Sequence, residues 1–297
     1  MRHRAAAPRG SRRGHDRAGM AAPAGPVSAR RRVPRTIAAM AQTIAVLSQK
    51  GGTGKTTTVR TLTDVLRRVG VRTLAVDLDP QGNLSDYFDV PPDVEPTVAD
   101  VLGGASSAEA AILGDVIPAS LNLAETELML GGKIGREMTL RKALADVKDE
   151  YEVVLVDCPP SLGLLTVNAL VAADYALVTA EAQYFALQGV EQALEVIEVA
   201  RDSLNDELEL VGVLLNLADM RTVHSREAKA SLQERFGGKV FETTVRSSIA
   251  YAESAERAAS ILDHRPDLGA DYVAVAGELL ERLPGMQDAR ARLDKLA

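Results

Sequence analysis

The feature that most constrains this chain is a glycine-rich loop between an apolar run and a helical pattern. Residues 43–47 form the apolar run, and the loop reads Ser48-Gln49-Lys50-Gly51-Gly52-Thr53-Gly54-Lys55-Thr56-Thr57. Such a loop points successive backbone N–H groups at an anion, and the helix that follows adds the positive end of its dipole. The sequence therefore predicts a phosphate-binding site.

The end of this loop fits the general phosphate-loop pattern G-x-x-x-x-G-K-[ST] at Gly54, Lys55 and Thr56, whereas Gln49 stands in the place of the first glycine. We predict that Lys55 neutralises β- and γ-phosphate charge and that the Thr56 hydroxyl binds Mg²⁺. The alternative is a turn that merely needs glycine, and the strand, loop and helix context argues against it. The predicted phosphate-binding residues are Gly51, Gly52, Thr53, Gly54, Lys55, Thr56 and Thr57.

Short apolar runs alternate with longer helical patterns along the chain, which predicts an α/β fold with a mostly parallel twisted sheet and helices on both faces. The expected strands cover residues 43–47, 73–76, 153–156, 176–179 and 210–215. The expected helices cover residues 55–69, 140–148, 164–172, 188–201, 225–236 and 270–283. Residues 86–135 are expected to form loop and short helix over one edge of the sheet.

With 297 residues, 46% of them hydrophobic, the chain can bury a sizeable core. We expect one domain over residues 41–285 and a C-terminal tail over 286–297. No run approaches the ~18 uninterrupted apolar residues that cross a bilayer, so we expect a soluble protein. The single cysteine, Cys158, excludes an intrachain disulfide and favours a reducing cytoplasm.

The first forty residues differ in composition from the rest. They hold ten arginines and one acidic residue, Asp16, a net charge of +9; removing them from the 34 basic and 41 acidic residues of the chain leaves 24 and 40, a net charge of −16 for residues 41–297. Since this leader has almost no apolar periodicity, we expect a disordered basic extension. It fits an arm that holds nucleic acid, an organellar transit peptide, or a true translation start at Met20 or Met40.

Three aspartates follow two of the expected strands. Asp77 and Asp79 come after residues 73–76, and Asp157 comes after residues 153–156. Ligands of open α/β sheets bind at the carboxyl ends of strands, so these side chains are expected to face the phosphate loop and to position Mg²⁺ and a water molecule. An aspartate after an apolar strand is as often a helix cap as a ligand, so this interpretation depends on the loop.

Lys50 is a second lysine in a loop where Lys55 already neutralises phosphate charge, and it adds like-charge repulsion there. Its presence is explained if Lys50 reaches the nucleotide of another subunit. The run from Lys50 to Thr56 resembles the deviant Walker A motif of the ParA/MinD family, whose signature lysine contacts phosphate across a nucleotide-sandwich dimer. The resemblance implies ATP and Mg²⁺ as cofactors and an ATP-dependent homodimer. It also implies that Lys50 and Lys55 act in catalysis.

The resemblance extends over most of residues 43–283. Residues 77–83 are similar to the Walker A′ motif of ParA proteins, and residues 157–161 are similar to their Walker B motif. The resemblance implies that Asp79 orients the attacking water, that Asp157 holds Mg²⁺ through a water ligand, and that Asp77 supports the metal site.

Two later segments also resemble the family. Residues 181–189 look like a dimer-facing loop, and residues 212–216 resemble the strand whose terminal asparagine reads the adenine edge. Asn216 is therefore the candidate for a base contact, because an amide supplies both a donor and an acceptor. The alternative is an ordinary turn asparagine at a strand end.

Among these relatives the sequence is most similar to the ParA/Soj partitioning ATPases. The resemblance implies an ATP-dependent dimerisation switch whose slow, partner-stimulated hydrolysis drives chromosome or plasmid partitioning. It also implies non-specific DNA binding by the ATP-bound dimer, a ParB-like centromere-binding partner, and a cytoplasmic, nucleoid-associated location. The tail carries no aromatic residue, so we expect no membrane attachment.

Two features depart from the family pattern. Residues 244–255 keep an arginine and a glutamate but lack the two prolines and the asparagine typical of chromosomal ParA proteins. The acidic body would repel DNA unless its basic residues cluster. The candidates for a local basic patch are Arg221, Arg226, Lys229, Lys239, Arg246 and Arg257. The alternative function is a positioning scaffold for protein cargo, similar to MinD, that does not bind DNA.

Overall fold

The structure, a computed structural model, describes residues 41–295. Within this range one parallel sheet has the strand order β3-β2-β4-β1-β5-β6. The strands are β1 (Gln42–Leu47), β2 (Thr73–Asp77), β3 (Val116–Ile117), β4 (Val153–Asp157), β5 (Tyr175–Glu181) and β6 (Glu209–Asn216). Strand β1 lies inside the sheet, paired with β4 on one side and β5 on the other.

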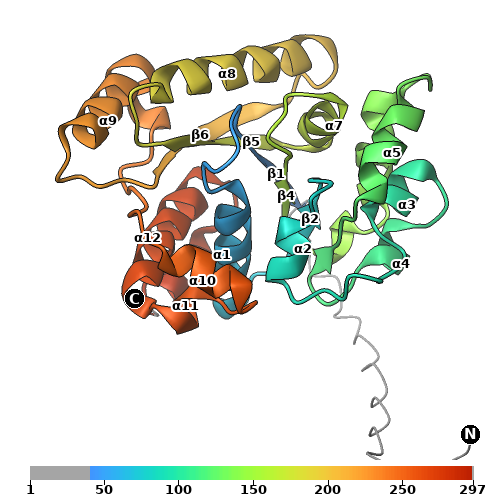
Figure 1. The fold of residues 1–297 in the computed structure, drawn as a ribbon, viewed down its shortest axis with the longest axis horizontal. Coiled ribbons are helices and arrows are strands. Elements are labelled where there is room, and N and C mark those ends of the chain that lie inside the picture. The colour runs from blue at the N-terminus through green and yellow to red at the C-terminus, as the bar shows by residue number, and fades with distance from the viewer. Residues whose placement is uncertain (1–40, 296–297) are drawn as a thin grey trace, which may run out of the picture. The chain divides into compact units, whose positions relative to one another are not determined.

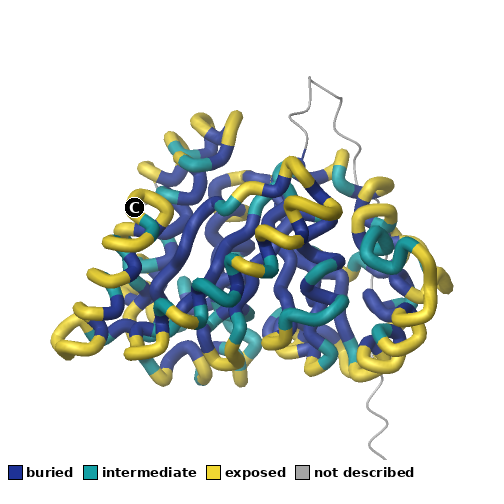
Figure 2. The backbone as a smooth tube through the Cα atoms, turned by 90° about the horizontal axis from the view of Figure 1, so that it is seen from above, coloured by how far each residue is buried: buried dark blue, intermediate teal, exposed yellow. Residues whose placement is uncertain are grey.

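The strands are continuous apolar runs because both faces of the sheet are covered. Successive side chains of β1 enter two different cores, with Ala45 and Leu47 in one and Ile44 and Val46 in the other. Every residue of β2 and β4 is buried. Figure 2 shows the strands as a buried interior enclosed by helices whose outer turns are exposed.

Two layers of helices cover the sheet (Figure 1). One layer contains α1 (Lys55–Arg68), α2 (Asn83–Tyr87), α10 (Ala250–Glu256), α11 (Ile261–His264), α12 (Pro266–Arg282) and α13 (Gln287–Leu293). The other contains α6 (Thr139–Ala145), α7 (Leu164–Ala172), α8 (Ala186–Ser203) and α9 (Val223–Phe236), with α3 (Val98–Gly103), α4 (Ala108–Ala111) and α5 (Asn122–Leu130) toward the β3 edge. Short 3₁₀ turns lie at Arg136–Met138, Lys148–Glu150 and Gly237–Lys239.

The predicted fold class is confirmed, and the five predicted strands and six predicted helices all form, with ends shifted by up to four residues. Helix α12 begins at Pro266 rather than at residue 270, because proline suits the first turn of a helix. Strand β3 was not predicted, since its two residues are too short to give a pattern.

The two ends of the chain differ in what the structure describes. The expected basic extension, residues 1–40, lies outside the described residues. Residues 286–297, expected as a tail, include the buried Met286 and α13, which buries Ala289 and Leu293. Within residues 41–295 the helices are all too short or too polar to span a bilayer.

Candidate functional site

The phosphate loop joins the carboxyl end of β1 to the first turn of α1, as predicted. Its turns require glycine at two positions, since Gly52 and Gly54 adopt positive φ angles of 76° and 82°. Gly54 is also closely covered, because a Cβ atom there would lie 2.8 Å from the Asn216 amide nitrogen. This glycine therefore sets both the turn and the contact between the loop and β6.

Lys55 begins α1 and is buried, with 6% of its surface exposed. Its ammonium group donates to the Ser48 hydroxyl at 3.1 Å and to the Lys50 carbonyl at 3.2 Å. Burial lowers the pKa of this ammonium group, and the negative charge of Asp157 opposes that shift. The Lys55 ammonium group, which is predicted to bind phosphate, is thus held within the loop by two neutral hydrogen-bond acceptors.

Asp157 and Thr56 meet at the end of β4. The Thr56 hydroxyl donates to Asp157 Oδ2 at 2.7 Å, while Asp157 Oδ1 is buried without a hydrogen-bond partner among the described residues. Burial, followed by the charge of Asp77, raises the pKa of Asp157 well above its usual range. A bound cation would stabilise the ionised carboxylate, so this uncompensated oxygen and the neighbouring hydroxyl fit a Mg²⁺ site.

Asp77 lies beside Asp157 across the β2–β4 pairing, fully buried. Both of its carboxylate oxygens are already used: Oδ1 accepts from the Asp79 N–H at 3.0 Å, and Oδ2 accepts from the Ser85 N–H at 2.9 Å and the Ser85 hydroxyl at 2.8 Å. Burial raises its pKa to about 6. Asp77 therefore braces the turn between β2 and α2, and a direct metal contact from it stays a prediction.

Asp79 lies on the turn that Asp77 braces, with 8% of its surface exposed. Its Oδ1 accepts from the Gln81 N–H at 3.0 Å, and its carbonyl accepts from the Gly82 N–H at 2.9 Å. These bonds fix the backbone that follows Asp79, and the bond from the Asp79 N–H to Asp77 fixes the backbone before it. The role of Asp79 in orienting water stays a prediction, for which the held turn is the support.

Asn216 ends β6 and reaches the underside of the phosphate loop. Its amide nitrogen donates to the Thr53 carbonyl at 2.8 Å and to the Thr58 hydroxyl at 3.2 Å, and only 1% of its surface is exposed. The Asn216 amide therefore supports the loop itself. The predicted base contact stays a prediction, and it requires the amide to leave one of these bonds or to use its buried Oδ1, which has no partner among residues 41–295.

The sequence reasoning missed several polar partners of the loop. Ser48 and Thr179 join the predicted loop residue Thr53 in a chain of buried hydroxyls between the loop and β5, and Ser85 binds Asp77. Thr179 and Ser85 carried no local signal, because their partners lie 126 and 8 residues away along the chain. Ser48 lies within the predicted loop, directly after an apolar run, and this position was the one local indication that its side chain is buried.

We expect Gly54→Ala to weaken MgATP binding more than Gly52→Ala, by about tenfold or more. Both substitutions strain a positive φ, but only the Gly54 Cβ atom would displace the Asn216 amide, while Gly52 has open space around it. Titration calorimetry of the two variants gives the comparison, with Gly52→Ala as the matched control. Equal affinities would show that the Asn216 contact does not support the loop.

Comparisons with known proteins agree with this geometry. Residues 41–210 match the family model described as an AAA domain. The chain is 37% identical over 249 residues to the sporulation initiation inhibitor protein Soj of Bacillus subtilis, a match that covers 81% of this chain and 98% of that one. It is also 37% identical over 250 residues to the chromosome partitioning protein ParA of Caulobacter vibrioides, covering 80% and 94% of the two chains.

A solved structure carries the ligands. Cobyrinic acid a,c-diamide synthase from Mycobacterium smegmatis, with bound ADP and magnesium, superposes with a TM-score of 0.68 at 36% identity and covers 76% of this chain and 95% of that chain. The predicted cofactors, ATP and Mg²⁺, and the predicted ATPase activity are thereby confirmed. The chain belongs to the ParA/Soj family of deviant Walker A ATPases, within the ParA/MinD superfamily.

Proposed function

We propose that this chain is an ATP-dependent dimerisation switch whose ATP hydrolysis drives chromosome or plasmid partitioning. The observation that carries the proposal is that the two lysines of the phosphate loop lie in different surroundings. Lys55 is buried at the start of α1, whereas Lys50 is exposed and its ammonium group lies 5.2 Å from the Phe185 ring. Because the Lys50 ammonium group points away from the phosphate loop of its own chain, it is suited to bind the nucleotide of a second copy.

The residues of one subunit divide the remaining work. Lys55 and the loop amides would bind the β- and γ-phosphates, and Thr56 and Asp157 would hold Mg²⁺, which would supply positive charge at the phosphate oxygens. Asp79 orients the attacking water. Because phosphoryl transfer depends on positioning and charge, a site completed by Lys50 of a second copy hydrolyses ATP only after assembly.

The proposal includes DNA binding by the dimer through the predicted basic residues. Two of the predicted basic residues are neutralised, since Arg221 pairs with Asp219 at 2.9 Å and Arg246 pairs with Asp271 at 2.8 Å. Arg226 and Lys229, on α9, donate to backbone carbonyls and form no ion pair with a carboxylate among the described residues. The proposal places the DNA phosphates near α9, and its main support is the naming of relatives as chromosome partitioning proteins.

The same charges favour the alternative of a cargo-positioning scaffold without DNA binding, because ion pairs remove part of the basic patch. The proposal further assigns residues 41–285 to the ATPase domain, with the basic residues 1–40 before it and residues 286–297 after it. It includes a ParB-like centromere-binding protein as the partner that stimulates hydrolysis, and a cytoplasmic, nucleoid-associated location.

We expect Asp79→Asn to lower the rate of phosphate release by about a hundredfold or more, while MgATP binding and ATP-dependent dimerisation persist. Asparagine keeps the acceptor that Asp79 Oδ1 offers to the Gln81 N–H, so the turn should hold while the carboxylate charge is lost. Asp86→Ala is the matched control, since Asp86 is an exposed acid on α2. A variant with the normal rate would remove Asp79 from catalysis.

We expect Lys50→Ala to bind MgATP but to remain monomeric, because its own cradle is intact and the contact across the dimer is lost. Light scattering and DNA retention would be measured with ATP and with ADP, at low and high salt. The unsubstituted chain should dimerise and retain DNA with ATP at low salt, and lose DNA as salt rises. A dimer with no DNA affinity at any salt concentration would support the scaffold instead, and a dimeric Lys50→Ala variant would contradict the switch.

A further inference from the structure

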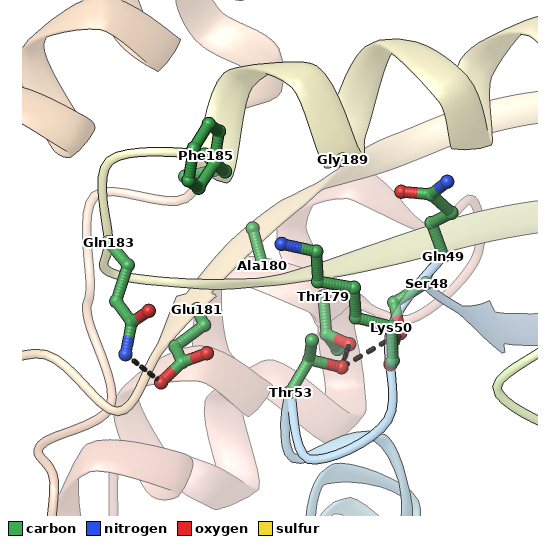
Figure 3. Close-up of a pocket in the computed structure, with 11 residues that line it drawn as sticks. Ser48, Gln49, Lys50, Thr53, Thr179, Ala180, Glu181, Gln183, Phe185 and Gly189 are labelled. Carbon is green, nitrogen blue, oxygen red and sulfur yellow. Dashed lines mark hydrogen bonds between the residues drawn. The ribbon is translucent and has the colours of Figure 1, made fainter.

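The side chain of Lys50 rests on an aromatic ring in the single chain. Figure 3 shows Lys50 extending from the phosphate loop toward Phe185, the residue that precedes α8, and its ammonium nitrogen lies 5.2 Å from the ring centroid. Phe185 is 56% exposed, and its ring packs edge-on against Tyr184, with 5.0 Å between ring centroids. A cation over the face of an aromatic ring is attracted by its quadrupole.

A chain of hydroxyl groups fixes the backbone of Lys50. Which hydroxyl donates and which accepts in each of its hydrogen bonds follows from the single proton that each hydroxyl carries. Each hydroxyl has one proton, and Ser48 gives its proton to the Lys50 carbonyl at 2.8 Å. Thr53 must therefore donate to Ser48 at 2.8 Å, and Thr179 must donate to Thr53 at 3.0 Å. Strand β5 thus orients the peptide from which the Lys50 side chain departs.

Lys50 and Glu181 line the same hollow, but among residues 41–295 they form no ion pair, and the contact of the Lys50 ammonium group is with the Phe185 ring. The Glu181 carboxylate accepts a hydrogen bond from the Gln183 amide instead. Lys55 occupies the other side of the loop, where it binds the Lys50 carbonyl. Repulsion between the two ammonium groups and attraction to the ring both turn Lys50 outward.

We propose that Phe185 is a positioning residue that holds Lys50 in the unassembled chain and releases it to the phosphate of a second copy. This inference rests on the proposed dimerisation switch. The ring and the phosphate compete for one ammonium group, so the ring contact opposes dimerisation and keeps Lys50 away from its own nucleotide. It is weak enough to be displaced by a charged phosphate group, which binds an ammonium ion more strongly.

The ring contact is tested in the full-length monomer by NMR with ¹³C-labelled lysine, the Lys50 signal being assigned from Lys50→Ala. The ε-methylene protons of Lys50 should be shifted upfield by the ring in the nucleotide-free chain. Phe185→Leu should abolish that shift and Phe185→Tyr should keep it. Tyr184→Leu, which removes a neighbouring ring from the same loop, is the matched control and should leave the shift in place.

The release step is tested by the dimer dissociation constant with a non-hydrolysable ATP analogue. Phe185→Leu should tighten the dimer about four- to twenty-fivefold, because a symmetric dimer releases two contacts that are each worth about two- to fivefold, and Phe185→Tyr should restore the original value. An unchanged Lys50 signal in Phe185→Leu, or a dimer that is not tightened, would overturn the inference. Failure of the unsubstituted chain to dimerise would instead overturn the proposed function and the release step together, whatever the monomer spectra show.

Discussion

The parallel pairing of β1 with β4 and β5 is the constraint on which the site depends. Parallel strands end at the same edge, so the phosphate loop, Asp157 and the loop before α8 must converge there. The pairing of β2 with β4 adds Asp77 and Asp79 to the same edge. No single loop contains the site; the register of the sheet assembles it.

The site contains buried aspartates, and the number of hydrogen bonds that stabilise each carboxylate differs. Asp77 has three donors for its two oxygens, whereas Asp157 has one donor and a buried oxygen without a partner among the described residues. A fully satisfied carboxylate supports a turn, and an unsatisfied one is suited to a cation. The two aspartates therefore differ in their surroundings although both end neighbouring strands, and the proposed Mg²⁺ site uses the one whose oxygen lacks a partner.

The sequence predicted what is encoded locally. Glycines in a row, an aspartate after an apolar run and a lysine before a threonine are patterns that a short window contains, and the phosphate loop and strand ends were predicted from them. The contacts of Asn216 with Thr53 and Thr58 join residues 163 and 158 positions apart, so no local pattern could reveal that this amide supports the loop. Phe185 lay in a segment identified by resemblance, but its position beneath Lys50 depends on how β5 pairs with β1.

The central claim is that Lys50 acts on the nucleotide of another copy, and mixing two inactive variants tests it most directly. In a mixed dimer of Lys50→Ala and Asp79→Asn, one site has its own Asp79 and receives Lys50 from the other chain. A concentrated equimolar mixture should therefore regain ATP hydrolysis, up to roughly a quarter of the normal rate: random pairing would make half of the dimers mixed, each with one complete site, and the mixed dimer keeps only one of the two Lys50 contacts. A mixture in which mixed dimers form but stay as inactive as either variant alone would contradict the account, because Lys50 would then serve its own chain.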